Sequence, residues 1–237
     1  MQVRIVFNTQ ALDENLLCGW GFSCLVNETV LFDTGEKEEY LFNNMHHMGI
    51  DVSKIKMAVI SHDHWDHTGG LGRLLKERKG LKVYGCAGFS EVFKERVRVL
   101  GGELIESSGI VEIEDDIFVT GEIAGEYKGK YMPEQALVLR TKNGISLITG
   151  CAHPGIINML KKVQAGFADH KIHAVFGGFH LMDTDKRIID ITLKRFKEMS
   201  VKIAGPTHCS GKEAEAIFKA AYADDFIELK AGSVVDI

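Results

Sequence analysis

The sequence lacks several features that would assign it to a class directly. No apolar run approaches the roughly 18 residues that a membrane span requires, and residues 1–7 do not resemble a cleavable apolar signal. The net charge is −5, so there is no basic excess to hold a nucleic-acid backbone. The five cysteines are odd in number and form no Cys-x-x-Cys pair, which argues against a disulfide framework. We therefore expect a cytoplasmic protein with reduced thiols that binds neither a membrane nor nucleic acid.

The length and the composition favour one folded unit. A chain of 237 residues with 45% hydrophobic content can bury a substantial core. No stretch has the composition of a linker. Apolar strand-like runs alternate with amphipathic helical segments, which is typical of an α/β protein. We therefore expect a single α/β domain over residues 1–237.

Turn and loop signals divide the chain further. Asn27-Glu28 and Asn143-Gly144 each separate two apolar β-type runs and predict hairpins. Asp183 or Thr184 is expected to cap a long amphipathic helix. Residues 121–133 contain three glycines and show no period, so we expect a loop that is long enough to reach a substrate. Contact of its lysines with phosphate is one interpretation, and a solvated surface loop is the favoured one.

One stretch, residues 61–70, carries most of the chemistry. It follows an apolar β-type run and holds three imidazoles and a carboxylate at the spacing His-x-His-x-Asp-His, namely His62, His64, Asp66 and His67. Such nitrogen and oxygen ligands suit zinc, iron or manganese better than calcium or magnesium. Residues two apart in an extended segment face the same way, so His62 and His64 can share one ion. Asp66 and His67, beyond the bend, can turn to a second ion.

This spacing, with Asp33-Thr34-Gly35 upstream, resembles the metallo-β-lactamase superfamily of binuclear metal hydrolases. Three later segments, residues 149–153, 177–181 and 206–211, look like the branch of that superfamily named for 7,8-dihydropterin-6-yl-methyl-4-(β-D-ribofuranosyl)aminobenzene 5′-phosphate synthase. The resemblance spans nearly the whole chain. It implies a metallo-β-lactamase αββα sandwich, in which two packed mixed sheets have helices outside them and the site lies along one edge.

The resemblance also implies roles for two residues outside the histidine cluster. Asp33 would hydrogen-bond to the cluster and orient it. His208 occupies the place of the superfamily's last histidine ligand, which would join Asp66 and His67 on the second ion.

The chain departs from the superfamily where an aspartate would bridge both ions, because Cys151 stands in that loop. Two arrangements remain open: Cys151 bridges the ions as a thiolate, or His153 completes the ligands of the first ion and no side chain bridges. We favour His153, because neutral imidazole serves zinc, iron and manganese alike, whereas a thiolate would restrict the metal. His180 is additional to the expected set and can be a general acid, a substrate contact or a support for a ligand.

Together these assignments define a candidate site. The expected metal ligands are His62, His64, Asp66, His67, His153 and His208, and the expected catalytic residues are Asp66 and His180. Asp33 is expected to support the ligands, and the role of Cys151 stays open. The expected cofactors are two divalent metal ions, with zinc preferred and iron or manganese as alternatives.

The function predicted from these residues is hydrolysis. We expect a mono- or binuclear metal centre that cleaves an ester or a phosphoester by metal-activated water. The expected substrate is a small, phosphorylated molecule. The branch resemblance implies a second activity, phosphoribosyl transfer to an aminobenzoate. A non-enzymatic metal or ligand sensor is the third hypothesis, because the bridging aspartate is missing.

Overall fold

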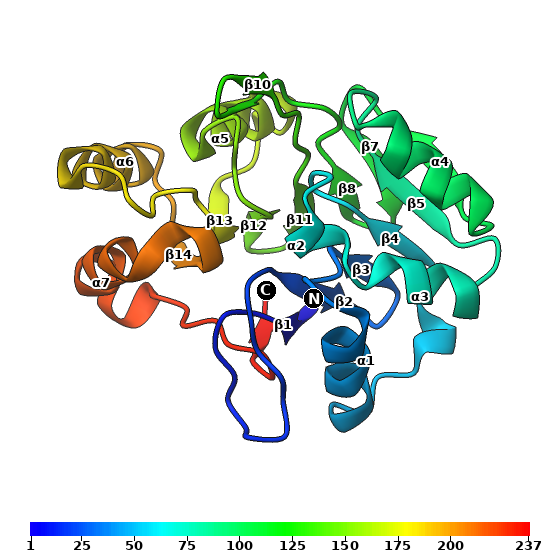
Figure 1. Ribbon diagram of the computed structural model, residues 1–237. Helices are drawn as coiled ribbons and strands as arrows, with labels where there is room; N and C mark the ends of the chain where they lie inside the picture. Colours follow the sequence, from blue (N-terminus) through cyan, green and yellow to red (C-terminus); the bar gives the residue numbers. More distant parts are fainter.

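Two β-sheets pack face to face at the centre of the computed structural model, which describes residues 1–237 (Figure 1). The first sheet has the strand order β15-β1-β2-β3-β4-β5-β6, and the second has the order β14-β13-β12-β11-β8-β7. The first sheet contains β1 (Gln2–Phe7), β2 (Ser23–Val26), β3 (Val30–Phe32), β4 (Met57–Val59), β5 (Lys82–Gly85), β6 (Glu103–Glu106) and β15 (Val234–Asp236). The second contains β7 (Val111–Glu114), β8 (Ile117–Val119), β11 (Leu137–Thr141), β12 (Gly144–Thr149), β13 (Ile172–Gly178) and β14 (Ile203–Thr207).

Helices cover the outer face of each sheet (Figure 1). The first sheet carries α1 (Glu38–His47), α3 (Leu71–Glu77) and α4 (Glu91–Val99), and the second carries α5 (Ile156–Gly166), α6 (Lys186–Glu198) and α7 (Gly211–Tyr222). The short elements are α2 (Trp65–Thr68), η1 (Val52–Lys54), η2 (His208–Ser210), η3 (Ala223–Asp225) and the hairpin of β9 (Glu126–Tyr127) and β10 (Lys130–Tyr131). None of the helices has the length and apolar character that a bilayer-crossing segment requires.

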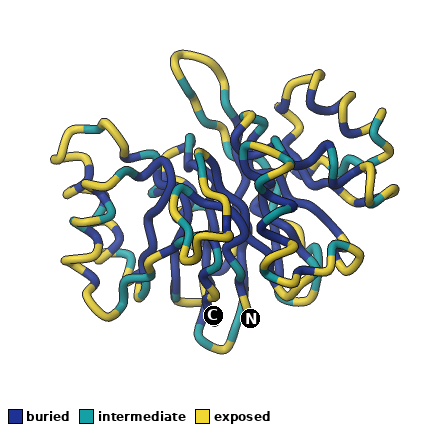
Figure 2. Tube along the Cα trace, turned by 60° about the horizontal axis from the view of Figure 1, so that its bottom comes forward, coloured by how far each residue is buried: buried dark blue, intermediate teal, exposed yellow.

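Three apolar clusters fill the spaces between these layers. One lies between the first sheet and its helices, one between the second sheet and its helices, and one between the two sheets. The middle cluster joins side chains of both sheets, among them Phe32 and Phe176. Figure 2 shows the buried strands in the middle of the molecule and the exposed chain mainly in the outer helices and loops. This arrangement confirms the predicted αββα sandwich.

Both predicted hairpins are present. Asn27 and Glu28 have φ angles of 47° and 62° between β2 and β3, which are the left-handed values that a two-residue type I′ turn needs. The second hairpin pairs β11 with β12 and turns at Lys142-Asn143, one residue earlier than the Asn143-Gly144 signal, because Gly144 already pairs with Thr141. Local turn chemistry therefore sets the register of both strand pairs.

The structure differs from the sequence prediction in two places, the cap of α6 and residues 121–133. Helix α6 is capped by Asp185 rather than by Asp183 or Thr184, because the Asp185 carboxylate accepts the N–H of Arg187. Residues 121–133, predicted as a loop, contain the hairpin β9–β10. Strand β15 pairs with β1, so the end of the chain returns to the first sheet.

Parallel strand pairing brings the sequence motifs to one edge of the sandwich. Strands β3 to β6 run parallel in the first sheet, and β12 to β14 run parallel in the second. The segments 61–67, 150–153, 177–180 and 206–209 lie at or just beyond the carboxyl ends of β4, β12, β13 and β14. Ligand sites of open α/β sheets lie outside these strand ends.

Candidate metal centre

A first group of three imidazoles lies where the two sheets meet. His62 and His64 come from the loop after β4, and His153 comes from the loop after β12. One nitrogen of each ring lies within 4.8 Å of the others. Three converging nitrogens form a set that can hold one metal ion.

A second group contains a carboxylate and two imidazoles. Asp66 and His67 are on the short helix α2, and His208 begins η2 after β14. The Asp66 Oδ2 atom lies 3.4 Å from the Nε2 atoms of both His67 and His208. The helical turn at residues 65–68 is the bend that separates these two ligands of the sequence motif from His62 and His64.

Cys151 lies between the two groups. Its sulfur is within 4.8 Å of ligand atoms of His62 and His67, and separately of His153 and His180. It also lies close to His208 and Cys209, and its distance to His67 Nε2 is 3.4 Å. The thiol therefore occupies the place between the groups where the sequence resemblance implies a bridging aspartate.

Asp33 and Ser61 fix the orientation of two histidine rings. Buried Asp33 accepts hydrogen bonds from the Ser61 N–H, the Ser61 hydroxyl and His67 Nδ1, each at 2.7 Å. Because Ser61 donates its hydroxyl hydrogen to Asp33, it accepts from His62 Nδ1 at 2.9 Å. His62 thus carries its hydrogen on Nδ1 and directs the lone pair of Nε2 toward the other ligands.

Glu134 is a site residue that the sequence analysis did not identify. It is fully buried, and its carboxylate accepts the backbone N–H groups of Cys151 (2.9 Å), Ala152 (2.8 Å) and His153 (2.8 Å). Burial raises the pKa of Glu134 to about 7, although these three donors act in the opposite direction. The carboxylate clamps the loop that presents Cys151 and His153.

Four residues of the site loops have left-handed backbone conformations although none is a glycine. The φ angles are 55° at Asp33, 64° at Ala152, 52° at His180 and 53° at His208. Such conformations cost about 1–3 kcal/mol each and persist only where the surroundings enforce them. Their concentration in these loops indicates that the strained backbone is needed to direct the side chains of the site, at a cost in local backbone stability.

The protonation states of the first ligand group suit metal binding. Burial lowers the pKa of His62 well below its ordinary value, lowers that of His64, and with neighbouring histidines lowers that of His153 to about 3. All three rings are therefore neutral near pH 7, which is the form that coordinates a metal. Burial opposes ionisation of Asp66, but the His208 and His67 rings, whose Nε2 atoms each lie 3.4 Å from its Oδ2, outweigh it and hold its pKa well below the usual range.

The unpaired polar atoms fit a metal ion as well. His62 Nε2 and both ring nitrogens of His153 and His208 are buried and have no hydrogen-bond partner. Leaving such a group unsatisfied costs about 1–3 kcal/mol, so five of them at one place call for a ligand. A donor set of imidazole nitrogen, carboxylate oxygen and thiol sulfur suits zinc or iron.

A cavity of about 510 Å³ opens above these groups. It is lined by Trp20, His64, Trp65, Asp66, Tyr127, Lys128, Cys151, His153, His180, Met182, Asp183 and Cys209. The Tyr127 ring on the hairpin β9–β10 lies 5.1 Å from the rings of both His64 and His153. The segment predicted to reach a substrate therefore forms one wall of this cavity.

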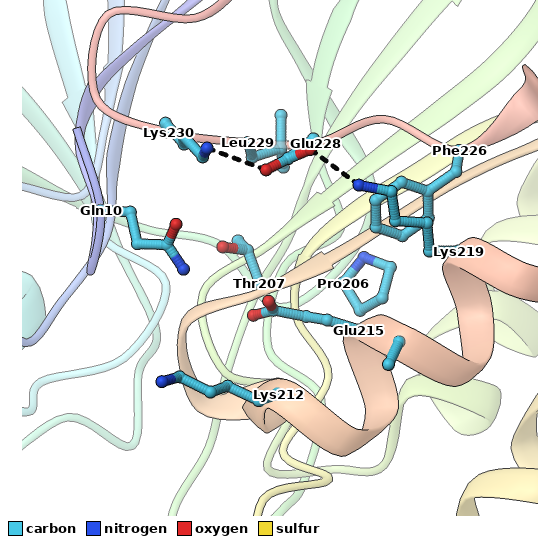
Figure 3. A pocket seen from close by; sticks show the side chains of 11 residues that line it. Gln10, Pro206, Thr207, Lys212, Glu215, Lys219, Phe226, Glu228, Leu229 and Lys230 are labelled. Carbon is cyan, nitrogen blue, oxygen red and sulfur yellow. Dashed lines mark hydrogen bonds and ion pairs between the residues drawn. The ribbon is translucent and has the colours of Figure 1, made fainter. Parts of the chain in front are cut away.

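A smaller cavity of about 190 Å³ lies beside α7 (Figure 3). Two of its lysines, Lys219 and Lys230, form ion pairs with Glu228 at 3.0 and 2.9 Å. It borders Thr207, the residue before His208, but none of the clustered histidines lines it. Candidate metal ligands therefore border the larger cavity and not this one.

Comparison with known proteins agrees with this fold. The family model of the metallo-β-lactamase superfamily matches residues 23–199. A 7,8-dihydropterin-6-methyl-4-(β-D-ribofuranosyl)-aminobenzene-5′-phosphate synthase of Methanocaldococcus jannaschii is 32% identical over 89% of this chain and 85% of its own length. A crystal structure described as a metal-dependent hydrolase of the β-lactamase superfamily has a TM-score of 0.83 and 29% identity, and covers 100% of this chain and 99% of that chain. The short form of human tRNase Z is 15% identical with a TM-score of 0.65, over 100% of this chain and 99% of that one, and shares the fold.

Proposed function

Because this chain belongs to the metallo-β-lactamase superfamily, we propose that it is a metal-dependent hydrolase acting on an ester or a phosphoester. The observation that carries the proposal is the pair of three-ligand groups with Cys151 between them. Members of both groups, His64 and His153 of the first and Asp66 of the second, line one cavity. Divalent metal bound there supplies Lewis acidity toward the ester or phosphoryl oxygen and lowers the pKa of water to about 7. This chemistry requires no nucleophilic side chain from the protein.

The proposed ligands follow the two groups. His62, His64 and His153 hold the first ion, and Asp66, His67 and His208 hold the second. The Cys151 thiol faces both positions. Zinc suits this set best, and iron or manganese are the alternatives.

Other side chains of the cavity bind the substrate and move protons. Asp66 is ionised and lines the cavity, so its carboxylate can accept a hydrogen bond from the attacking water and orient it. His180 also lines the cavity and can donate a proton to the leaving oxygen. Lys128 lies at the tip of the hairpin β9–β10, where its ammonium can pair with an anionic group of the substrate.

Phosphoribosyl transfer is the second candidate. It is favoured by the name of the archaeal relative, whose product joins a ribose phosphate to an aminobenzene ring, at 32% identity over most of both chains. Trp20, Trp65 and Tyr127 give the cavity aromatic walls against which such a ring can stack.

The test begins with the metal and the reaction. Purified protein loaded with zinc, iron and manganese in turn is expected to hold between one and two ions per chain, and to release p-nitrophenol from a phosphoester of the bis(p-nitrophenyl) phosphate type. A content below about 0.2 ions per chain with every metal contradicts the proposal. Pyrophosphate release from phosphoribosyl pyrophosphate and an aminobenzoate, without ester cleavage, selects the second candidate instead.

Two substitutions test the second ligand group. Asp66→Asn and His208→Ala are each expected to lower turnover at pH 7 about 100-fold while sparing the fold. Asp63→Asn is the matched control, because Asp63 lies in the same loop but in neither ligand group, and it should keep nearly full activity. Near wild-type rates for the first two variants with one ion lost rule out a binuclear mechanism.

A further inference from the structure

A second groove lies between α5 and α6 and differs in character from the main cavity. Its volume is about 250 Å³, and its walls include Ile156 and Ile157 of α5, Phe179 and Leu181 of the loop after β13, and Ile188 of α6. No aspartate, glutamate, lysine or arginine lines it. The main cavity, in contrast, is lined by Asp66, Asp183 and Lys128.

The groove and the main cavity meet at one pair of histidines. His153 and His180 line both spaces, and their ring centroids are 4.6 Å apart. A ligand held at these rings therefore has a polar, aromatic space on one side and an uncharged space on the other.

Ile188 marks the groove as a binding surface. Its side chain is 48% exposed, although the neighbouring Ile189 is buried in the core cluster of the second sheet. The residues around it on α6, Lys186, Arg187 and Asp190, are charged and exposed, as expected for the outer face of a surface helix. Ile188 is thus an uncovered apolar side chain facing a groove that leads to the candidate metal centre.

We propose that this groove binds the apolar part of the substrate, so that the scissile ester or phosphoester lies at His153 and His180 while its polar part enters the main cavity. The proposal rests on the proposed function and names its substrate class: an ester or phosphoester of an uncharged aliphatic or aryl group of about six to eight carbons. A cavity of about 150 Å³ already admits benzene, so the groove has room for such a group.

Binding of alkylphosphonates tests the groove without relying on turnover. Calorimetric titration of the zinc-loaded protein with methyl-, butyl- and hexylphosphonate is expected to show affinity rising about two- to threefold per added methylene, since each one leaves water for an apolar wall. In Ile188→Asn this rise should be lost while the affinity for methylphosphonate stays unchanged. Ile188→Ala should give an intermediate slope.

Ile191→Asn is the matched control. Ile191 is 55% exposed on the same helix and does not line the groove, so this variant should keep the parent's dependence on chain length. Equal slopes in the parent and in Ile188→Asn, or a flat series in the parent, overturn the proposal.

Turnover of methyl and hexyl p-nitrophenyl phosphate separates this inference from the proposed function. If phosphonate affinity rises with chain length and depends on Ile188, but neither diester is cleaved, the result supports apolar binding in the groove and contradicts the proposed hydrolase activity. Cleavage of both diesters at equal kcat/KM with a flat binding series supports the hydrolase and contradicts the groove.

Discussion

The two sheets contribute to the candidate site in different ways. The first sheet supplies His62, His64, Asp66 and His67 from six consecutive positions, and side chains of the same half hold two of these rings through hydrogen bonds. The second supplies His153, His180 and His208 from three separate loops. Every ring nitrogen of His153 and His208 lacks a partner.

The difference shows that the two halves are organised by different forces. On the first sheet, Asp33 and Ser61 orient the rings before any ligand binds. On the second sheet the side chains are free and the backbone is fixed, by Glu134 and by the left-handed residues at the loop ends. Substitutions of side-chain anchors should therefore damage the first half most, and substitutions of the backbone anchor should damage the second.

The largest effect is expected from Asp33→Ala. It leaves the Ser61 N–H, the Ser61 hydroxyl and the His67 ring without an acceptor in a fully buried place, and removes a buried charge partner. We expect the free energy of unfolding of the metal-free protein to fall by about 3–5 kcal/mol, measured by urea denaturation. Asp33→Asn is the control for the backbone, because asparagine adopts the φ of 55° at a lower cost than alanine. A loss below about 1 kcal/mol for alanine shows that the orientation of the rings is fixed elsewhere.

The ion pair between Asp33 and His67 predicts that the free energy of unfolding depends on pH. Burial lowers the pKa of His67, but the Asp33 carboxylate outweighs it and raises that pKa well above its ordinary value of 6.5. The folded protein then binds more protons than the unfolded chain above pH 6.5, so stability is fully present below that pH and is lost as the pH rises toward the folded pKa. The metal-free protein should lose stability as the pH rises above 6.5, and Asp33→Asn should flatten that slope. A parent whose stability is constant over this range contradicts the ion pair.

A smaller effect is expected from Glu134→Ala. Three backbone N–H groups lose their acceptor, but no ion pair is broken and the burial cost of the carboxyl is relieved. We expect a loss of about 2–3 kcal/mol by urea denaturation, and about 1 kcal/mol for Glu134→Gln, which keeps one acceptor oxygen. Metal titration should show a weaker first ion in Glu134→Ala. If Glu134→Ala shows the full stability loss but binds metal with unchanged affinity, Glu134 stabilises the fold and does not position the metal ligands.

The features of the fold and the site that could be predicted from the sequence are those encoded by residues close together in the chain. The histidine spacing, the turn at Asn27-Glu28 and the alternation of strands and helices depend on neighbours in the chain, and the sandwich that they imply is confirmed. Glu134 has no such signal. It stands 17 residues before Cys151 and contacts its N–H only because β11 and β12 pair. The position of β15 beside β1 is likewise set by the assembled core rather than by residues 234–236 themselves.

Cys151→Ser tests the thiol that lies between the halves. The two three-ligand groups remain complete without it, so we expect at least one ion per chain after dialysis and a stability change of about 1 kcal/mol or less. Elemental analysis of the variant beside the parent measures this. Loss of both ions shows that the thiolate is a primary ligand, in which case the His153 assignment fails.

The smallest structural effect is expected from His180→Asn. This substitution tests whether the second sheet supplies a residue that takes part in the reaction but neither binds metal nor stabilises the fold. His180 belongs to neither three-ligand group, its ring is partly exposed, and its Nδ1 has no partner, so its removal breaks no hydrogen bond of that atom. Asparagine also accepts the φ of 52° at this position. Stability should change by less than about 1 kcal/mol and metal content should stay at the parent's value.

Turnover of His180→Asn, however, should fall about 100-fold for a phosphoester with a poor leaving group, because such an ester needs a proton on the departing oxygen. A p-nitrophenyl ester serves as the control, since its leaving group departs without that proton and its rate should change little. Equal losses for both esters show that His180 positions the substrate instead, and a loss of metal shows that it is a ligand.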